Sequence, residues 1–166
     1  MSNITLKGHK VALEGNFVKV GHAAPSFTLL DQKLSERHLS DFKNKKKILY
    51  IVPSLDTEVC LLSTRILNEA AKKHPEAIFL IISADLPFAQ KRICGLEKLD
   101  NVITLSMVKD KTFAHDYGVL IGEGFLQGLC ARALIVLDGH DKVLHAELVS
   151  EISHEPSYEK ALAFLH

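Results

Sequence analysis

The chain has 166 residues, of which 47% are hydrophobic, and 20 basic side chains balance 20 acidic ones, so the net charge is zero. This length predicts one domain, residues 1–166, with a substantial core, and the charge balance leaves no basic excess for binding nucleic acid or membrane phosphates. The N-terminus lacks the apolar segment of a secretory signal, and no apolar run is long enough to span a bilayer. We therefore expect a cytoplasmic protein, in which three cysteines favour metal binding or redox chemistry over a structural disulfide framework.

The predicted elements alternate as in an α/β protein. Alternating apolar positions and two glycine turns predict a β-hairpin extension over residues 1–21. Strands are predicted over 47–52, 78–82 and 102–106, the first two buried on both faces, and a β-hairpin over 133–137 and 142–149. Helical segments are predicted over 39–42, 61–73, 85–94, 112–117 and 157–165, with Cys60 in the first turn of the second and Gly95 ending the third.

The segment Pro53-Ser54-Leu55-Asp56-Thr57-Glu58-Val59-Cys60 is expected to be the loop between the first buried strand and the longest helix. A thiol in the first turn of a helix lies near unsatisfied backbone N–H groups and the positive end of the helix dipole, which both favour the thiolate. A free cysteine is also typical of a small buried apolar side chain. Cys60 on its own therefore leaves a nucleophile and a core residue as open alternatives.

The spacing Pro53-x-x-x-Thr57-x-x-Cys60 resembles the active-site motif of the peroxiredoxins, the thiol-dependent peroxidases, and in particular of their thiol peroxidase subfamily. Further matches follow in chain order: Thr64-Arg65, the stretch from Ser83 to Gly95, Asp116-Tyr117-Gly118-Val119 and Ala131-Arg132-Ala133. The resemblance implies a thioredoxin-like fold of three layers, with a central mixed β-sheet flanked by helices. The predicted order of parallel β-α-β units, a β-hairpin and a terminal helix is also the order of that fold.

The resemblance also implies which residues act on hydroperoxides. Cys60 is expected to attack the weak O–O bond, while Thr57 offers its hydroxyl and Arg132 its permanently charged guanidinium. Pro53 is expected to shape the loop and shield the sulfur from water. Taken singly, each has an ordinary structural explanation; for example, threonine suits a helix start. Arg65, five residues beyond Cys60, is expected either near this loop or on a solvated helix face.

A cysteine sulfenic acid condenses with a second thiol. Cys94 is the expected resolving cysteine, because the subfamily carries one in this helix of the same subunit and because a helix end before Gly95 frays at little cost. Cys130 stands two residues before Arg132, on the same side if the segment is extended, so a third thiol near the site stays open. A core position is the preferred interpretation of Cys130.

Two positions depart from the resembled pattern: Glu58, where proline is usual, and Leu61, where a polar or acidic residue is frequent. If the Glu58 carboxylate points inward, its charge would oppose formation of the Cys60 thiolate. If it is exposed at the helix start, its charge would interact favourably with the helix dipole. The resemblance implies that organic hydroperoxides are better substrates than hydrogen peroxide, and Leu61 beside the thiol is expected to strengthen that preference.

Other classes of protein fit less well. The sequence has no Cys-x-x-Cys or His-x-x-x-His pair, so a zinc site or a disulfide reductase is not expected. The glycines between Gly118 and Gly128 do not match a dinucleotide fingerprint, and no nicotinamide, flavin or haem cofactor is expected. The family implies antioxidant defence, thioredoxin as the reductant and a homodimer. The alternative is a thioredoxin-fold redox-sensing or binding protein without efficient turnover.

Overall fold

The computed structural model describes residues 4–166 and contains eleven strands and six helical segments. The strands are β1 (Ile4–Leu6), β2 (His9–Val11), β3 (Leu13–Glu14), β4 (Thr28–Leu30), β5 (Glu36–His38), β6 (Lys47–Ile51), β7 (Ile78–Ser83), β8 (Ile103–Ser106), β9 (Leu120–Ile121), β10 (Ala133–Leu137) and β11 (Val143–Leu148). The α-helices are α1 (Glu58–Lys73), α2 (Pro87–Glu97), α3 (Thr112–Asp116) and α4 (Tyr158–Leu162), and the 3-10 helices are η1 (Leu39–Phe42) and η2 (Ala163–Leu165).

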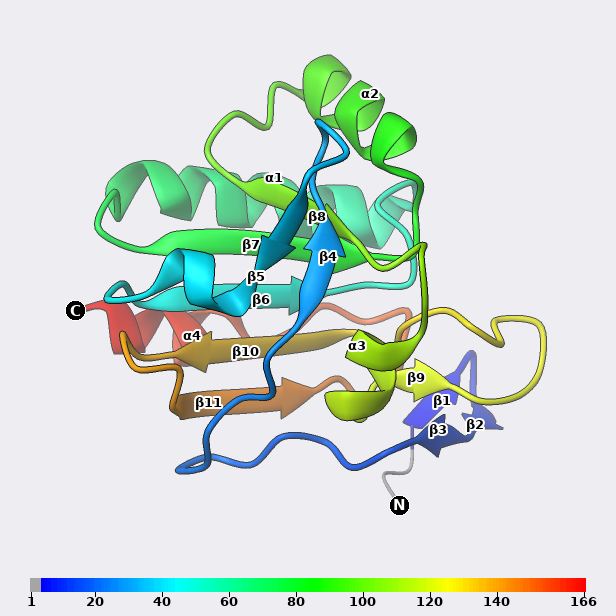
Figure 1. Ribbon diagram of the computed structural model, residues 1–166. Coiled ribbons are helices and arrows are strands. Elements are labelled where there is room, and N and C mark those ends of the chain that lie inside the picture. Colours follow the sequence, from blue (N-terminus) through cyan, green and yellow to red (C-terminus); the bar gives the residue numbers. More distant parts are fainter. Residues whose placement is uncertain (1–3) are drawn as a thin grey trace.

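Seven of the strands form a mixed sheet in the order β11-β10-β6-β7-β8-β4-β5 (Figure 1). The three central strands β6, β7 and β8 are parallel, and α1 and α2 are the crossovers between them. The other four strands pair antiparallel at the two sides. Strands of such a parallel centre are covered on both faces, which explains why β6 and β7 are nearly continuous apolar runs.

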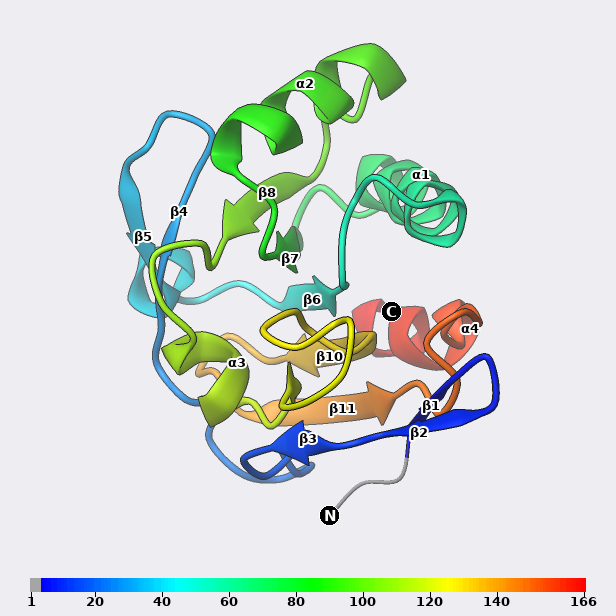
Figure 2. The same ribbon diagram turned by 90° about the vertical axis from the view of Figure 1, so that its right-hand side faces the viewer.

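The two faces of the sheet carry separate apolar clusters because successive side chains of a strand point to opposite sides. One cluster joins Ile48, Tyr50 and Val52 with residues of α1, α2 and α4. The other joins Leu49 and Ile51 with residues of η1, α3 and the N-terminal segment. Figure 2 shows this layering, with α1, α2 and α4 on one side of the sheet and α3 on the other. The predicted three-layer, thioredoxin-like arrangement is confirmed.

The N-terminal β-hairpin is confirmed as the antiparallel pair β1 and β2, which is shorter than the predicted extension over 1–21. Residues 1–3 of that prediction lie outside the described residues. The strand β3 that follows pairs with β9, more than one hundred residues away, and not with the hairpin. Gly15 then turns the chain with φ +79°, where a Cβ would lie 2.0 Å from the His115 carbonyl oxygen, so only glycine fits there.

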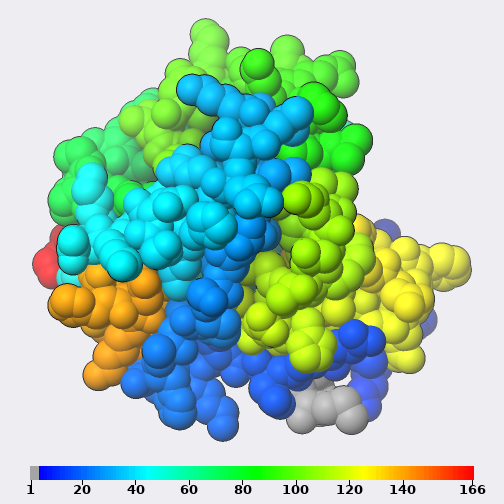
Figure 3. Space-filling model, in the orientation of Figure 1, coloured from blue at the N-terminus to red at the C-terminus, as the bar shows by residue number. Residues whose placement is uncertain are grey.

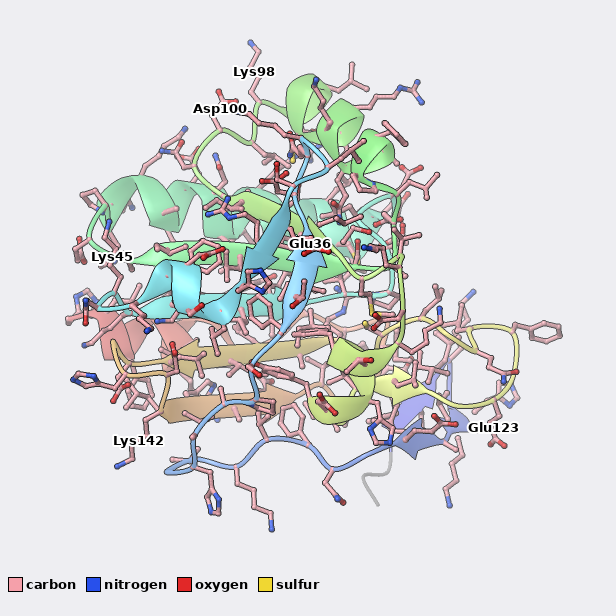
Figure 4. All side chains as sticks on the ribbon, viewed as in Figure 1. Glu36, Lys45, Lys98, Asp100, Glu123 and Lys142 are labelled. Atoms are coloured by element: carbon pink, nitrogen blue, oxygen red, sulfur yellow. The ribbon has the colours of Figure 1, made fainter. Side chains whose placement is uncertain are left out.

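The strand predictions for β6, β7, β8, β10 and β11 are confirmed within one or two residues at each end, but β4, β5 and β9 were not predicted. The predicted end of α2 at Gly95 is wrong. Gly95 lies inside the helix, and Lys98 takes the left-handed conformation (φ 54°) that ends it. Burial of Leu99 and its N–H bond to the Cys94 carbonyl fix this exit, and the Lys98 side chain extends into solvent beyond the helix end (Figure 4).

Within residues 4–166, no helix is both long enough and apolar enough to cross a membrane.

Candidate active site

Cys60 lies in the first turn of α1, as predicted, and its side chain is fully buried. Thr57 is the N-cap of this helix, and its hydroxyl oxygen accepts the backbone N–H of Cys60 at 3.2 Å. Because that oxygen acts as an acceptor, the hydroxyl proton of Thr57 is left to donate to another group. Thr57 is an exposed residue, so its hydroxyl lies at the surface of the loop.

Arg132 brings a buried cation to the same sulfur. It precedes β10, which pairs with β6, and its Nη1 donates to Cys60 Sγ at 3.2 Å. The guanidinium also donates from Nη1 to Tyr50 Oη at 2.6 Å and from Nε to the Ile152 carbonyl at 2.9 Å. A cation two per cent exposed requires such partners, because an unpaired buried charge is costly. The structure thus joins Thr57, Cys60 and Arg132, three of the predicted residues.

The electrostatics keep this cation charged. Burial lowers the pKa of Arg132, but the facing Tyr50 and Cys60 groups raise it more, so its pKa lies above the ordinary value. Burial disfavours the charged form of Tyr50 as well, which raises the pKa of this phenol to about 12 despite the nearby guanidinium. Tyr50 is therefore a neutral phenol at any physiological pH, and Arg132 is the positive charge facing the sulfur.

The loop before the helix is held by one carboxylate. Asp85 accepts hydrogen bonds from Ser54 Oγ at 2.8 Å, from the Leu55 N–H at 2.7 Å and from Ser83 Oγ at 2.7 Å. These bonds fix the loop between β6 and α1 to the loop between β7 and α2. Pro53 is buried within the first of these loops.

The structure also places Glu58 and Leu61, which depart from the family pattern, and Arg65. Glu58 is exposed in the first turn of α1, so its charge suits the helix dipole and does not point at the sulfur. Leu61, next to the thiol in sequence, is half-buried. Arg65 does not reach the loop: it is an exposed residue that donates from Nε to Glu97 of α2 at 2.9 Å.

Cys94 lies in α2 within the same apolar cluster as Cys60, and no disulfide joins them. Burial raises the pKa of the Cys94 thiol, and hydrogen bonds with Gln32 and Thr104 offset only part of that rise. The two thiols therefore have different partners: a cation for one, and neutral polar groups for the other.

Cys130 is not a third thiol at this site. Of the two alternatives for this residue, the preferred one, a core position, is confirmed. Cys130 packs in the apolar cluster on the opposite face of the sheet from Cys60, with its Sγ 3.2 Å from Met107 Sδ. Complete burial raises the pKa of its thiol to about 12, so it is a core residue.

Sequence reasoning assigned no role to Tyr50, and it placed Asp85 at the start of a helix. One signal for Tyr50 was present: a hydroxyl in an otherwise apolar, fully buried strand must find a hydrogen-bond partner. Asp85 directly precedes Leu86 and the helix-initiating Pro87, where an acidic side chain is free to bind a neighbouring loop. No local pattern names that loop as its partner.

The arrangement combines a sulfur at a helix N-terminus, a cation at hydrogen-bond distance and a hydroxyl group at the loop surface. Such a site can stabilise a thiolate and donate to the oxygens of an electrophile that the thiolate attacks. Within residues 4–166, no group of three or more His, Cys, Asp or Glu side chains is placed to hold a metal ion.

Known proteins resemble this chain in sequence and in fold. The family model described as Redoxin matches residues 19–162. A thiol peroxidase from Oceanobacillus iheyensis is 45% identical over 166 residues, which is 100% of this chain and 99% of that protein. The crystal structure of a peroxiredoxin-like protein from Aquifex aeolicus, 37% identical, has a TM-score of 0.93 and covers 99% of this chain and 96% of that one. The thiol peroxidase from Chromobacterium violaceum, 24% identical, shares the fold with a TM-score of 0.91 over 98% and 94% of the two chains.

Proposed function

This chain belongs to the redoxin family of peroxiredoxins and is a thiol peroxidase, and on that premise we propose that Cys60 is the thiol that attacks hydroperoxides. The observation that carries the proposal is the position of Cys60 Sγ, 3.2 Å from the buried guanidinium of Arg132 and in the first turn of α1. Both surroundings favour a negatively charged sulfur over a neutral one.

In the first step, the Cys60 thiolate forms an S–O bond with the terminal oxygen of the hydroperoxide while the O–O bond breaks. The electron pair of the O–O bond stays on the other peroxide oxygen, which takes a proton and leaves as an alcohol or as water. Cys60 is oxidised by two electrons to a sulfenic acid. Arg132 and the free hydroxyl proton of Thr57 stabilise the charge that moves onto the peroxide oxygens, and Pro53 keeps water away from the sulfur.

In the second step, the Cys94 thiol attacks the sulfenic sulfur, a disulfide forms and water leaves. The α-carbons of a disulfide lie within about 7 Å of each other, and both cysteines now lie inside helices with other partners. Since Cys60 and Cys94 lie in different helices and have different partners, the proposal includes local unwinding of the two helices before the bond forms.

Three features of α2 support such unwinding beside Cys94. Gly95 lies inside the helix, where glycine costs about 1 kcal/mol relative to alanine, and Lys98 takes an unfavourable left-handed conformation. The ion pair of Arg65 with Glu97, which ties α2 to α1, is solvent-exposed, and such pairs contribute at most about 1 kcal/mol.

The proposal includes partners. A dithiol donor, thioredoxin by family resemblance, reduces the disulfide and restores both thiols. Three free cysteines suit a reducing compartment such as the cytoplasm. A homodimer is supported by the loop between β9 and β10, which projects from the body of the molecule (Figures 1 and 3) and carries the fully exposed Phe125.

The test is peroxide consumption with a thioredoxin system, using hydrogen peroxide and cumene hydroperoxide. Cys60→Ser is expected to abolish consumption, and Cys94→Ser to consume one equivalent per chain and then stop. Cys130→Ala is the matched control and should turn over like the unmodified chain. Mass spectrometry of the oxidised protein should find a disulfide between Cys60 and Cys94.

Activity that survives in Cys60→Ser, or a disulfide that involves Cys130, would contradict these assignments. An unmodified chain that reacts once but does not turn over would favour the redox-sensing alternative. If cumene hydroperoxide and hydrogen peroxide react equally fast, the expected influence of Leu61 on substrate choice is wrong.

A further inference from the structure

The guanidinium of Arg132 is aimed by the groups that surround it. Its Nη1 atom donates one proton to Tyr50 Oη at 2.6 Å and the other to Cys60 Sγ at 3.2 Å. The two N–H bonds of this nitrogen lie in the guanidinium plane at a fixed angle, so the direction of one determines the direction of the other. The Tyr50 oxygen therefore sets how the second N–H points at the sulfur.

Beyond Tyr50, a series of polar side chains leads to the surface. Ser63 of α1 lies near the Tyr50 hydroxyl and lowers its pKa, and the oxygens of Ser63 and Tyr158 are 2.7 Å apart. Tyr158 Oη is also 2.8 Å from a carboxylate oxygen of the exposed Glu155.

Counting protons gives this series one consistent direction. A carboxylate only accepts, so Tyr158 gives its single proton to Glu155, and Ser63 donates to the Tyr158 oxygen. The Ser63 oxygen is then left as an acceptor facing Tyr50, and the Tyr50 oxygen accepts from Arg132.

The network lies in the interior of the protein. Tyr50 and Ser63 are fully buried and Arg132 is two per cent exposed. A phenylalanine would fill the same place in β6 without a polar atom to satisfy. A buried hydroxyl that replaces apolar surface is costly unless it is bonded, so the hydroxyl of Tyr50 is an addition that packing alone does not need.

We propose that Tyr50 is a positioning residue of the peroxidase reaction: supported by Ser63 and Tyr158, its hydroxyl holds the Arg132 guanidinium against the sulfur of Cys60. The inference rests on the proposed role of Cys60. Without the hydroxyl, Nη1 has an unsatisfied buried N–H, and the guanidinium turns toward another acceptor and away from the sulfur.

The test compares Tyr50→Phe with Tyr117→Phe in the full, reduced chain. Tyr117 is the matched control: it is equally buried, and its hydroxyl donates to the Pro25 carbonyl at 2.7 Å on the other face of the sheet. The first measurement is the rate of Cys60 alkylation by iodoacetamide as a function of pH, followed at that residue by mass spectrometry. The second is the rate constant for hydrogen peroxide at pH 7.

In Tyr50→Phe we expect the midpoint of the alkylation profile to move to higher pH and the peroxide rate constant to fall about tenfold. Tyr117→Phe should lower thermal stability by a similar amount while the profile and rate constant stay as in the unmodified chain. Tyr158→Phe, at the half-buried end of the series, should shift the profile in the same direction by less. It carries the test if Tyr50→Phe does not fold.

A folded Tyr50→Phe with an unchanged profile and rate constant would overturn the inference, as would equal shifts in Tyr50→Phe and Tyr117→Phe. If Tyr50→Phe does not fold, an unchanged profile in Tyr158→Phe overturns it. The proposed function fails in a different way, through absent peroxide consumption by the unmodified chain, and the alkylation profile does not depend on that activity.

Discussion

Cys60 and Cys130 are both fully buried thiols whose surroundings differ. A guanidinium nitrogen lies 3.2 Å from the sulfur of Cys60, whereas the sulfur of Cys130 faces the thioether of Met107 at the same distance. A cation stabilises a thiolate, but an apolar surrounding opposes it. Burial alone therefore does not distinguish a reactive cysteine from a core residue; the charge of the nearest partner does.

The raised pKa of Cys130 predicts a loss of stability in alkali. In an unfolded chain this thiol titrates near 9, but in the folded protein its pKa is about 12. Below pH 9 both states hold the proton; as the pH rises above 9 only the unfolded chain releases it, which favours unfolding. The free energy of unfolding of the unmodified chain should then fall, relative to that of Cys130→Ala, by about 1.4 kcal/mol per pH unit.

Chemical unfolding of both proteins between pH 8 and pH 10.5 measures this difference. Parallel curves over that range would mean that the Cys130 thiol titrates normally in the folded protein and that its environment is not apolar.

Among the elements, the loop before α1 and the loop before α2 are joined through Asp85. Its carboxylate accepts two bonds from Ser54 and Leu55 in the first loop and one from Ser83 at the end of β7. The backbone carbonyl of Asp85 also accepts from Ser106 at 2.5 Å. The segments that begin the two cysteine-bearing helices therefore share one anchor, and loosening one loosens the other.

Replacement of Asp85 by asparagine tests this coupling. An amide has one acceptor oxygen without a charge where the carboxylate has two charged ones, so the bonds to the loop are weakened, at a cost of about 1–3 kcal/mol in stability. Hydrogen exchange should become faster in residues 53–57 and in residues 84–90 together, and the peroxide rate constant should fall several-fold.

Asp100, an exposed carboxylate in the turn after α2 (Figure 4), provides the control. Asp100→Asn should leave hydrogen exchange unchanged in residues 53–57 and in residues 84–90. Faster exchange in only one of the two peptides of Asp85→Asn would contradict the shared anchor.

In the whole molecule, the N-terminal hairpin supports the segment that binds Arg132. Thr5 of β1 accepts the Ile152 N–H at 2.8 Å on its carbonyl, and the carbonyl of Ile152 accepts from Arg132. Glu151 completes the junction by accepting from the hydroxyl of Thr5 and the N–H of Lys7. The hairpin, the segment around residue 151 and the buried cation form one continuous set of contacts.

Glu151 makes the attachment of the hairpin sensitive to acid. Its hydrogen bonds, first that from the Thr5 hydroxyl, lower its pKa from 4.5 to about 2. A lowered folded-state pKa gives stability that is present above about pH 4.5 and is lost as the pH falls toward 2. Glu151→Gln should speed hydrogen exchange in residues 5–11 at pH 7. Between pH 4.5 and pH 2.5 this variant should lose less of its stability than the unmodified chain, because it lacks the carboxylate that titrates.

Thr28→Ala, which removes an exposed hydroxyl bonded to His38 at the far side of the sheet, is the control and should not change exchange in the hairpin. If Glu151→Gln and the unmodified chain exchange equally in residues 5–11, the carboxylate does not hold the hairpin.

The sequence determined the features that depend on neighbours along the chain. Apolar runs identified the buried strands β6 and β7, and the motif around Thr57 and Cys60 identified a capped helix start, because strands and caps are local patterns. The end of α2 at Lys98 was missed, since burial of Leu99 outweighed the local preference for Gly95. The pairing of β3 with β9 was missed because two-residue strands carry no period.

Only the tertiary structure decided which of the candidate residues meet. The bonds from Arg132 to Tyr50 and to Cys60 span 82 and 72 residues of sequence, and they exist because β10 lies beside β6 in the sheet. The same packing placed Cys130 on the opposite face from Cys60. Contacts across a sheet depend on strand order and register, which no window of sequence contains. The family motif therefore indicated Cys60 and Arg132 as candidates, and the fold shows that their side chains are in contact.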